Sequence, residues 1–288
     1  MFKKAVLLVL VVLCLLLACA PKEVAVVEAP LPCVEEEEVR PEVLRMVVIP
    51  SDDEVSTREK LQPFMTYLEN GIGMKVELVT VVDYAAVVEA MKYGHADLAR
   101  FGPLNYAQAT EEADVEPLIT AYKRKTGTAF YNSLIISRPD LEDLNGVDFA
   151  YVSPGSGSGY GAPYVYMQEN DIELGEVVFA GSHPAVIEAV KNGSVDAGAI
   201  ADNRWFVALE EGAVTEDEVK IFATSDPIPN IVWAVQTDMG PELKKDLLIT
   251  FLNMPEETVL SFGTDEIRFV IAHDSDYDIM RKMLEVLD

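Results

Sequence analysis

From residue 44 onward, short apolar runs alternate with longer stretches of helical spacing. Residues 44–49, which are apolar except for Arg45, predict a strand ending at Pro50. Residues 60–70 place their large apolar side chains on one helical face. Further strands are expected over residues 75–82, 97–101, 133–137, 147–152, 177–179 and 196–200, and further helices over residues 84–93, 160–170, 184–192 and 202–211. This alternation predicts an α/β fold with mostly parallel sheets, covered by helices on both faces.

The first residues follow a different pattern. Lys3 and Lys4 precede an uncharged stretch that ends at Ala18. A spanning helix needs roughly 20 apolar residues and a secretory signal roughly 7–15, so residues 1–18 predict a signal peptide. The sequence Leu-Leu-Ala-Cys ending at Cys19 resembles the lipobox of bacterial-type lipoproteins. That resemblance implies cleavage before Cys19 and a lipid anchor on its sulfur; the alternative is an ordinary signal peptide that happens to contain cysteine.

Residues 19–43 predict a tether between this anchor and the folded part. Prolines recur through the segment, and residues 35–38 form an acidic run. Such a composition keeps a chain extended and solvated.

Charge and cysteine content restrict the possible partners. The chain carries 49 acidic and 22 basic residues, for a formal net charge of −27. This balance argues against nucleic acid and anionic membrane surfaces, although local donors can still hold an anionic ligand. Of the three cysteines, Cys14 lies in the signal peptide, Cys19 is the lipidation site and Cys33 stands alone. With three scattered histidines besides, we expect no disulfide framework, no metal site and no cofactor.

A Gly/Ser-rich turn offers the most informative candidate site. It covers residues 153–160, between an expected strand and an expected helix, and includes Ser156 and Ser158. A helix start presents unpaired N–H groups and a positive dipole end, so this turn could hold an oxyanion without Lys or Arg. The alternative is a flexible Gly/Ser loop without a ligand.

Three further side chains lie at expected strand-to-helix junctions. They are Tyr84 after Asp83, Tyr106 after a Gly-Pro pair, and His183 in a Gly-Ser-His-Pro turn. Ligands of open α/β sheets bind beyond the carboxyl ends of strands, so these positions are binding candidates. Each tyrosine could instead be a packing aromatic, and the histidine a surface residue at a helix start.

Taken in order, these motifs resemble the PhnD-like phosphonate-, phosphite- and phosphate-binding proteins of ABC importers. The resemblance covers roughly residues 47–287. It rests on the segments 83–90, 96–99, 102–106, 141–146, 156–160, 181–183, 189–199 and 276–278. No single segment is decisive, but their order and spacing are specific.

The resemblance implies a type II periplasmic-binding-protein fold, with two α/β lobes joined by two crossing strands. It places one lobe at residues 44–135 plus 237–288 and the other at 137–235. The crossings are expected near 131–137 and 232–237. It also implies that Ser156, Gly157, Ser158 and His183 hold the oxyanion while Tyr84 and Tyr106 close over it.

The chain departs from the family pattern in ways that bear on the ligand. Gly157 replaces a threonine of the turn, which removes one hydroxyl donor, and Ser153 replaces a usual aspartate. Asp202 matches one carboxylate that holds the amine of aminoalkyl phosphonates, but Asn230 stands where the second is expected. This weakened amine clamp favours a smaller ligand such as phosphite, methylphosphonate or phosphate. Asp202 could alternatively accept a hydrogen bond from a P–OH group, or serve as a helix N-cap.

The sequence therefore indicates an extracytoplasmic, membrane-anchored binding lipoprotein that delivers a small phosphorus oxyanion to an ABC permease. We expect a monomer and no enzymatic activity, because no ordered nucleophile–base spacing supports catalysis. The alternatives are a sensor domain for another small anion, an enzyme on the same scaffold, and a structural or adhesive surface lipoprotein.

Overall fold

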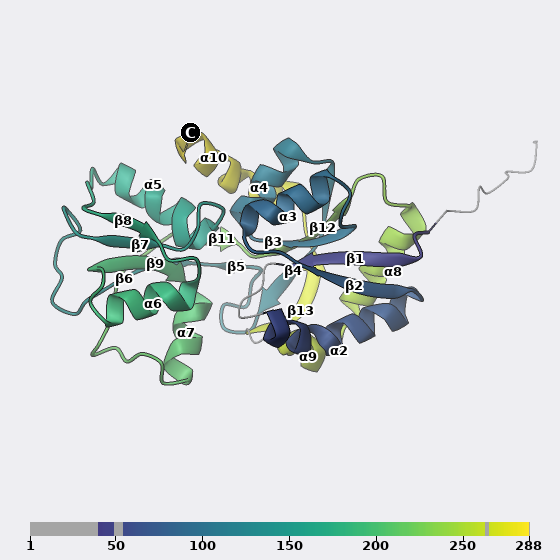
Figure 1. Ribbon diagram of the computed structural model, residues 1–288, viewed down its shortest axis with the longest axis horizontal. Coiled ribbons are helices and arrows are strands. Elements are labelled where there is room, and N and C mark those ends of the chain that lie inside the picture. The colour runs from purple at the N-terminus through teal and green to yellow at the C-terminus, as the bar shows by residue number, and fades with distance from the viewer. Residues whose placement is uncertain (1–39, 49–53, 263–264, 288) are drawn as a thin grey trace, which may run out of the picture. The chain divides into compact units, whose positions relative to one another are not determined.

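Two mixed β-sheets organise the residues that the computed structural model describes, which are 40–48, 54–262 and 265–287 (Figure 1). Residues 38–288 form one compact unit. The predicted signal peptide over 1–18, Cys19, Cys33 and the predicted tether as far as residue 39 lie outside the described residues. Among the described helices, none combines the length and apolar character that a membrane crossing requires.

The first sheet has six strands. Their spatial order is β13 (Glu266–Ile271), β4 (Val115–Lys123), β12 (Val232–Gln236), β3 (Leu98–Phe101), β1 (Val43–Val48) and β2 (Lys75–Thr80). β1 pairs in parallel with β2 and β3, whereas β12 pairs in antiparallel fashion with β3 and β4, as β13 does with β4. One face packs against α2 (Glu54–Ile72), α8 (Pro241–Leu252) and α9 (Glu256–Val259), and the other against α3 (Tyr84–Lys92), α4 (Pro103–Glu112) and α10 (Asp278–Leu287).

The second sheet has five strands. Their order is β10 (Lys220–Thr224), β6 (Ser133–Ser137), β9 (Ala197–Ala201), β7 (Phe149–Tyr151) and β8 (Val177–Phe179). α5 (Ala162–Glu169) covers one face, while α6 (His183–Lys191) and α7 (Asp202–Glu210) cover the other. β7 is parallel to β8 and β9, but β6 is antiparallel to β9 and β10.

The predicted α/β class is correct, but the prediction of mostly parallel sheets is wrong. Each sheet receives strands after the chain has crossed from the other sheet, and these strands enter in the opposite direction. Antiparallel pairs therefore stand beside the parallel units in both sheets. Hydrophobic periodicity reports burial and carries no information on strand direction, so the pattern could not distinguish the two.

The chain passes between the sheets at a two-stranded ladder of β5 (Phe130–Tyr131) and β11 (Ile228–Pro229). The sequence places the crossings near 131–137 and 232–237. In the structure, β6 instead lies inside the five-stranded sheet and β12 inside the six-stranded sheet. A crossing strand and a central strand are both apolar, which is why the sequence pattern does not separate them.

Each lobe buries one tryptophan. Trp233 of β12 stacks on Phe64 of α2 with ring centroids 5.1 Å apart and packs against Phe251 of α8 at 5.5 Å. Trp205 of α7 is equally buried, within an aliphatic cluster between α6, α7 and the five-stranded sheet. The two tryptophans therefore belong to separate clusters of different composition, one in each lobe.

Candidate functional site

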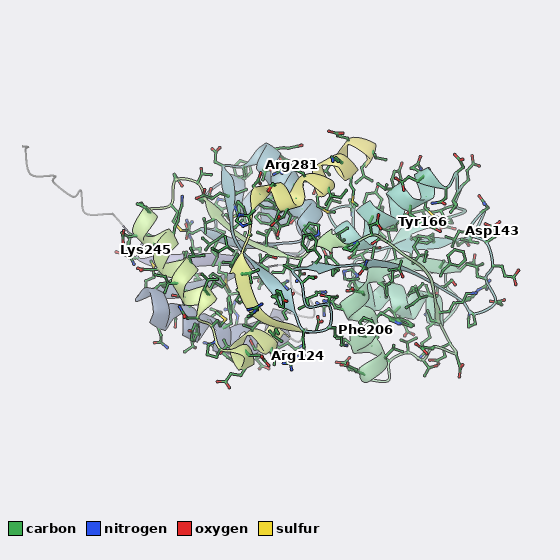
Figure 2. The ribbon with its side chains drawn as sticks, turned by 180° about the vertical axis from the view of Figure 1, so that it is seen from behind. Arg124, Asp143, Tyr166, Phe206, Lys245 and Arg281 are labelled. Atoms are coloured by element: carbon green, nitrogen blue, oxygen red, sulfur yellow. The ribbon has the colours of Figure 1, made fainter. Side chains whose placement is uncertain are left out.

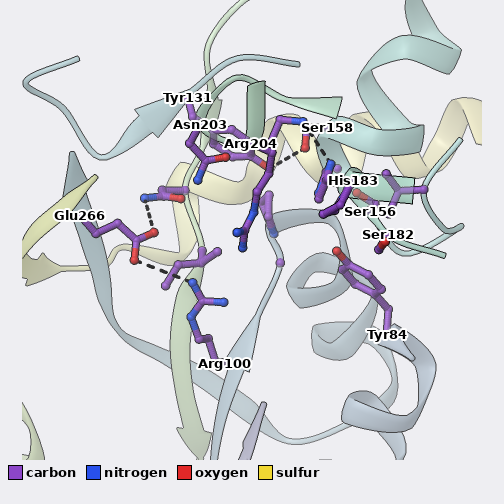
Figure 3. A pocket seen from close by; sticks show the side chains of 18 of the residues that line it. Tyr84, Arg100, Tyr131, Ser156, Ser158, Ser182, His183, Asn203, Arg204 and Glu266 are labelled. Atoms are coloured by element: carbon purple, nitrogen blue, oxygen red, sulfur yellow. Dashed lines mark hydrogen bonds and ion pairs between the residues drawn. The ribbon is translucent and has the colours of Figure 1, made fainter. Parts of the chain in front are cut away.

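A cavity of about 130 Å³ lies where strand ends and helix starts of the two sheets meet (Figure 3). It is lined by residues of both lobes and of the hinge ladder. The polar side chains among them are Tyr84, Arg100, Tyr131, Ser156, Ser158, Ser182, His183, Asn203, Arg204, Asn230 and Glu266. Hydrogen-bond donors therefore outnumber carboxylates in this space.

The predicted Gly/Ser turn forms one wall of the cavity. It follows β7 and leads into a π-helical turn, η1 (Gly157–Gly161), which continues as α5. Ser156 is the N-cap of this turn, and its hydroxyl oxygen accepts a hydrogen bond from the Gly159 N–H at 3.0 Å. The Ser158 hydroxyl accepts a hydrogen bond from the Tyr131 phenol at 3.3 Å. Both serines are almost fully buried, and both line the cavity.

Two glycines allow this turn to approach the opposite lobe. A Cβ atom added at Gly155 would lie 2.6 Å from the Cβ of Tyr84. At Gly157 it would lie 3.1 Å from the Cγ of Pro103, at the start of α4. The threonine that the family places at position 157 would therefore be crowded by α4 in this arrangement.

His183 presents a neutral imidazole to the cavity. It is the first residue of α6, and its Nδ1 accepts a hydrogen bond from the Ala201 N–H at 3.2 Å. Burial, with a contribution from the nearby positive charge of Arg204, lowers the pKa of His183 to about 3. The proton of the neutral ring therefore resides on Nε2, which makes that atom a hydrogen-bond donor.

Two arginines bring positive charge to the cavity, and neither was identified from the sequence. Arg100 comes from β3 and Arg204 from the first turn of α7; Figure 3 shows both head groups directed into the same space. No hydrogen bond or ion pair joins Arg204 to the described residues. A cation in the first turn of a helix opposes the helix dipole, so its presence there was the available signal for a ligand-binding role.

Burial lowers the pKa of Arg100, an effect that Glu266 opposes and Arg204 reinforces. Arginine nevertheless keeps its proton in proteins. The described lining of the cavity therefore combines two guanidinium groups with one carboxylate, that of Glu266.

Glu266 is that carboxylate, at the start of β13. It is only 1% exposed. Its Oε1 accepts a hydrogen bond from the Asn230 amide at 3.4 Å, and its Oε2 lies 3.8 Å from Nη2 of Arg100. Sequence reasoning did not identify Glu266 either. A carboxylate at the first position of a largely apolar strand was the available signal.

Most of the predicted binding residues reach this cavity. Tyr84, Ser156, Gly157, Ser158, His183 and Asn230 all line it. Burial raises the pKa of Tyr84, and a hydrogen bond with Ser156 opposes the rise. The Tyr84 phenol is therefore protonated at neutral pH and can act as a hydrogen-bond donor.

Tyr106 is placed elsewhere, outside the residues that line the cavity. Its ring is fully buried and packs edge-on against Tyr277 at 4.8 Å. Its hydroxyl donates to Asp274 at 2.8 Å, and Arg281 of α10, which is labelled in Figure 2, donates to the same carboxylate. Tyr106 therefore joins α4 to the last helix.

Asp202 also lies outside the cavity lining, in the hinge. Its carboxylate pairs with Lys123 of β4 at 3.3 Å and accepts a hydrogen bond from the Asn132 N–H at 3.0 Å. The N-cap of α7 is Ala201, so the alternative reading of Asp202 as an N-cap is wrong. Lys123 also lies over the Tyr131 ring, 4.7 Å from its centroid. Within the described ranges, no cluster of three or more His, Cys, Asp or Glu residues could hold a metal ion.

Comparisons with known proteins agree with this geometry. Residues 46–277 match the family model described as ABC transporter, phosphonate, periplasmic substrate-binding protein. The chain is similar to the phosphate-import protein PhnD of Mycolicibacterium smegmatis, at 31% identity over 85% of this chain and 86% of that protein. It is also similar to the phosphonates-binding periplasmic protein of Escherichia coli, at 25% identity over 76% of this chain and 69% of that protein.

Solved structures share the fold. PhnD1 of Prochlorococcus marinus, in complex with methylphosphonate, superposes with a TM-score of 0.77 at 22% identity, covering 86% of this chain and 99% of that one. A phosphonate transporter binding component of Pseudomonas aeruginosa gives 0.73 at 19% identity, covering 84% and 85%. These structures confirm the predicted two-lobed periplasmic-binding-protein fold.

The family match also confirms that the protein is a transporter component without enzymatic activity, as the sequence indicated. Periplasmic placement follows from the same match. The chain thus belongs to the family of periplasmic substrate-binding proteins of phosphonate ABC transporters.

Proposed function

We propose that this protein captures a small phosphorus oxyanion in the cavity between its lobes and delivers it to an ABC permease. The observation that carries the proposal is the convergence of Arg204, which has no partner among the described residues, with neutral donors on the Ser156–Ser158 turn and His183. In a desolvated cavity, fixed donors of this kind hold an anion strongly. Relatives that import phosphate or bind methylphosphonate support the same ligand class.

We infer a division of roles around the phosphoryl group. The N–H groups of the π-helical turn and the two serine hydroxyls contact its oxygens from one side. Nε2 of His183 donates as a neutral group, and Arg204 neutralises charge. Tyr84 closes the cavity from the other lobe.

The amine clamp expected for aminoalkyl phosphonates is not supported by the positions of Asp202 and Asn230. Asp202 is engaged by Lys123 in the hinge, and the Asn230 amide donates to Ala121 and Glu266. A small ligand without an amine, such as phosphate, phosphite or methylphosphonate, remains the better fit.

A thermal-shift panel tests this function. Phosphate, phosphite, methylphosphonate, 2-aminoethylphosphonate and sulfate would each be added to the purified protein. A ligand at 100 times its dissociation constant stabilises the folded state by about 2.7 kcal/mol. We expect a rise in melting temperature with at least one phosphorus oxyanion. Absence of any shift across the panel would contradict the proposal.

We further propose that the protein is anchored through Cys19 and acts as a monomer. The lipobox-like sequence before Cys19 supports the anchor. Expression of wild type and Cys19→Ala, followed by membrane fractionation and mass spectrometry of the N-terminal peptide, tests it. A lipid-free Cys19 in the wild-type protein would disprove the anchor and leave the binding function unaffected.

A further inference from the structure

Among the described residues that line the cavity, Glu266 is the one acidic side chain, and the others offer mainly donors and positive charge. We propose that Glu266 accepts a hydrogen bond from a protonated oxygen of the bound anion. The site then selects oxyanions that carry a P–OH group over donor-free anions of the same shape. This inference rests on the proposed function and adds the protonation state of the ligand to it.

The surroundings of Glu266 hold the carboxylate in place and leave one oxygen without a donor. The Asn230 amide donates to Oε1 at 3.4 Å and to the Ala121 carbonyl at 3.0 Å, so both of its hydrogens are used. Oε2 has no hydrogen-bond partner among the described residues. Its separation of 3.8 Å from Nη2 of Arg100 is within ion-pair range but too long for a hydrogen bond.

A buried acceptor of this kind discriminates between ligands. An anion without a proton would bring its own lone pairs toward a carboxylate, which costs free energy in a desolvated site. A P–OH group would instead supply the donor that Oε2 lacks, and hydrogen bonds to charged groups are the strong ones. The remaining anion oxygens would still meet Arg204, the serine hydroxyls and His183.

A ligand ammonium group could also satisfy Glu266, but the charges around it disfavour this. The charged and titratable groups that surround Glu266 are Arg100 of β3, its cross-strand partner Lys123 of β4, Tyr131 of β5 and Arg204 of α7. Among the lining residues that the structure describes, two guanidinium groups already outnumber one carboxylate. An ammonium would add a further positive charge, whereas a neutral P–OH proton would not.

Matched ligand pairs test the proposal by isothermal titration calorimetry on the purified protein. Methylphosphonate and methanesulfonate at pH 6 have the same shape and predominantly the same charge, but only the first carries a hydroxyl proton. Hydrogen phosphate and sulfate form a second pair at pH 8.5, where both are predominantly dianions and only the first carries a hydroxyl proton. One charge-assisted hydrogen bond corresponds to about a 10- to 100-fold preference, so we expect the wild type to favour the phosphorus ligand of each pair by that factor.

Glu266→Gln is the decisive variant, because an amide can donate as well as accept. We expect weaker methylphosphonate binding, stronger methanesulfonate binding, and a ratio of affinities close to one. The control is Glu257→Gln, at an exposed position of α9, which should leave both affinities unchanged. A purely structural role of Glu266 would lower both affinities together and keep their ratio.

Several outcomes would overturn the proposal. An unchanged ratio in Glu266→Gln is one, and tighter binding of 2-aminoethylphosphonate than of methylphosphonate, lost in the same variant, is another. If the variant does not fold, the wild-type protein still tests the proposal, because equal affinities for the phosphorus and sulfur ligands of each pair would contradict it. Binding of phosphorus ligands without discrimination refutes only the role of Glu266, whereas absence of binding refutes the proposed function as well.

Discussion

The two walls of the cavity differ in chemistry and in the kind of element that supplies it. The wall from the five-stranded lobe consists largely of neutral donors on turns and helix starts, including Ser156, Ser158 and His183. The wall from the six-stranded lobe carries Arg100 and Glu266, two charged side chains set in strands. We infer that the first wall determines where an oxyanion sits, while the second determines which oxyanion is accepted.

The largest expected effect is on the free energy of unfolding and concerns the hinge, which positions the two walls relative to each other. Lys123→Met leaves the Asp202 carboxylate without its ion-pair partner in a nearly dry environment. Breaking a buried pair in this way costs about 3–5 kcal/mol. Urea denaturation should show this loss.

Two controls accompany the hinge prediction. Lys125→Met removes an exposed pair with Glu210 and should change the free energy of unfolding by less than about 1 kcal/mol. The double variant Lys123→Met/Asp202→Asn should recover part of the loss. A single variant as stable as the wild type would show that the hinge does not depend on this pair.

The next effect concerns Arg204, the one charged side chain on the otherwise neutral wall. Arg204→Ala removes a charge-assisted hydrogen bond worth about 1.5–3 kcal/mol, so we expect roughly a 10- to 100-fold weaker affinity for the phosphorus ligand. Calorimetric titration measures it, with Arg124→Ala at the exposed surface as the control. Unchanged affinity would mean that neutral donors alone hold the ligand.

A smaller effect should follow from separating the walls. Gly155→Ala places a methyl group 2.6 Å from the Cβ of Tyr84. Crowding of this kind costs about 1–3 kcal/mol. Here the cost would oppose the approach of the two lobes. We expect weaker ligand binding with a smaller change in melting temperature of the ligand-free protein. Ser153→Ala in the same turn serves as the control, and equal affinities in both variants would contradict the close approach.

The smallest effect tests the neutrality of the first wall. His183 has a pKa of about 3 in the folded protein and an ordinary value near 6.5 when unfolded, so the unfolded chain takes up more protons below about pH 6.5. Stability should therefore fall as the pH drops from about 6.5 toward 3.

Between pH 7 and pH 5 we expect His183 to contribute a loss of about 1–2 kcal/mol. Urea denaturation of His183→Gln at the two pH values should show that this part of the loss has disappeared. His95→Gln, at an exposed turn, should behave like the wild type. Ring nitrogen shifts of an imidazolium at pH 5 would contradict the neutral state.

The difference between the walls also explains what the sequence could reveal. Turns after strands have recognisable residues, so the positions of Ser156, Ser158 and His183 at the cavity were predictable, while their contact with a ligand stays a prediction. Tyr106 occupies the same kind of junction as Tyr84, but it packs under α10 and does not line the cavity. The sequence around Tyr106 does not indicate that contact. Such choices depend on neighbours distant along the chain.

The charged residues that the sequence left unassigned illustrate a second limit. Arg100 and Glu266 belong to different strands separated by most of the chain, and only the sheet order brings them to one cavity. Strand direction and crossing points were mispredicted for the same reason. Periodicity describes each element, whereas sheet order and pairing arise between elements.

The single tryptophan in each lobe has a practical consequence. Trp205 and Trp233 are the only tryptophans in the chain, and each is sealed in a different core. Replacing either one by phenylalanine would leave a single intrinsic fluorophore that reports on one lobe. The fluorescence of the two variants during denaturation would then show whether the lobes unfold together or one after the other. Because Trp205 is adjacent to Arg204, its fluorescence should also change when a ligand binds.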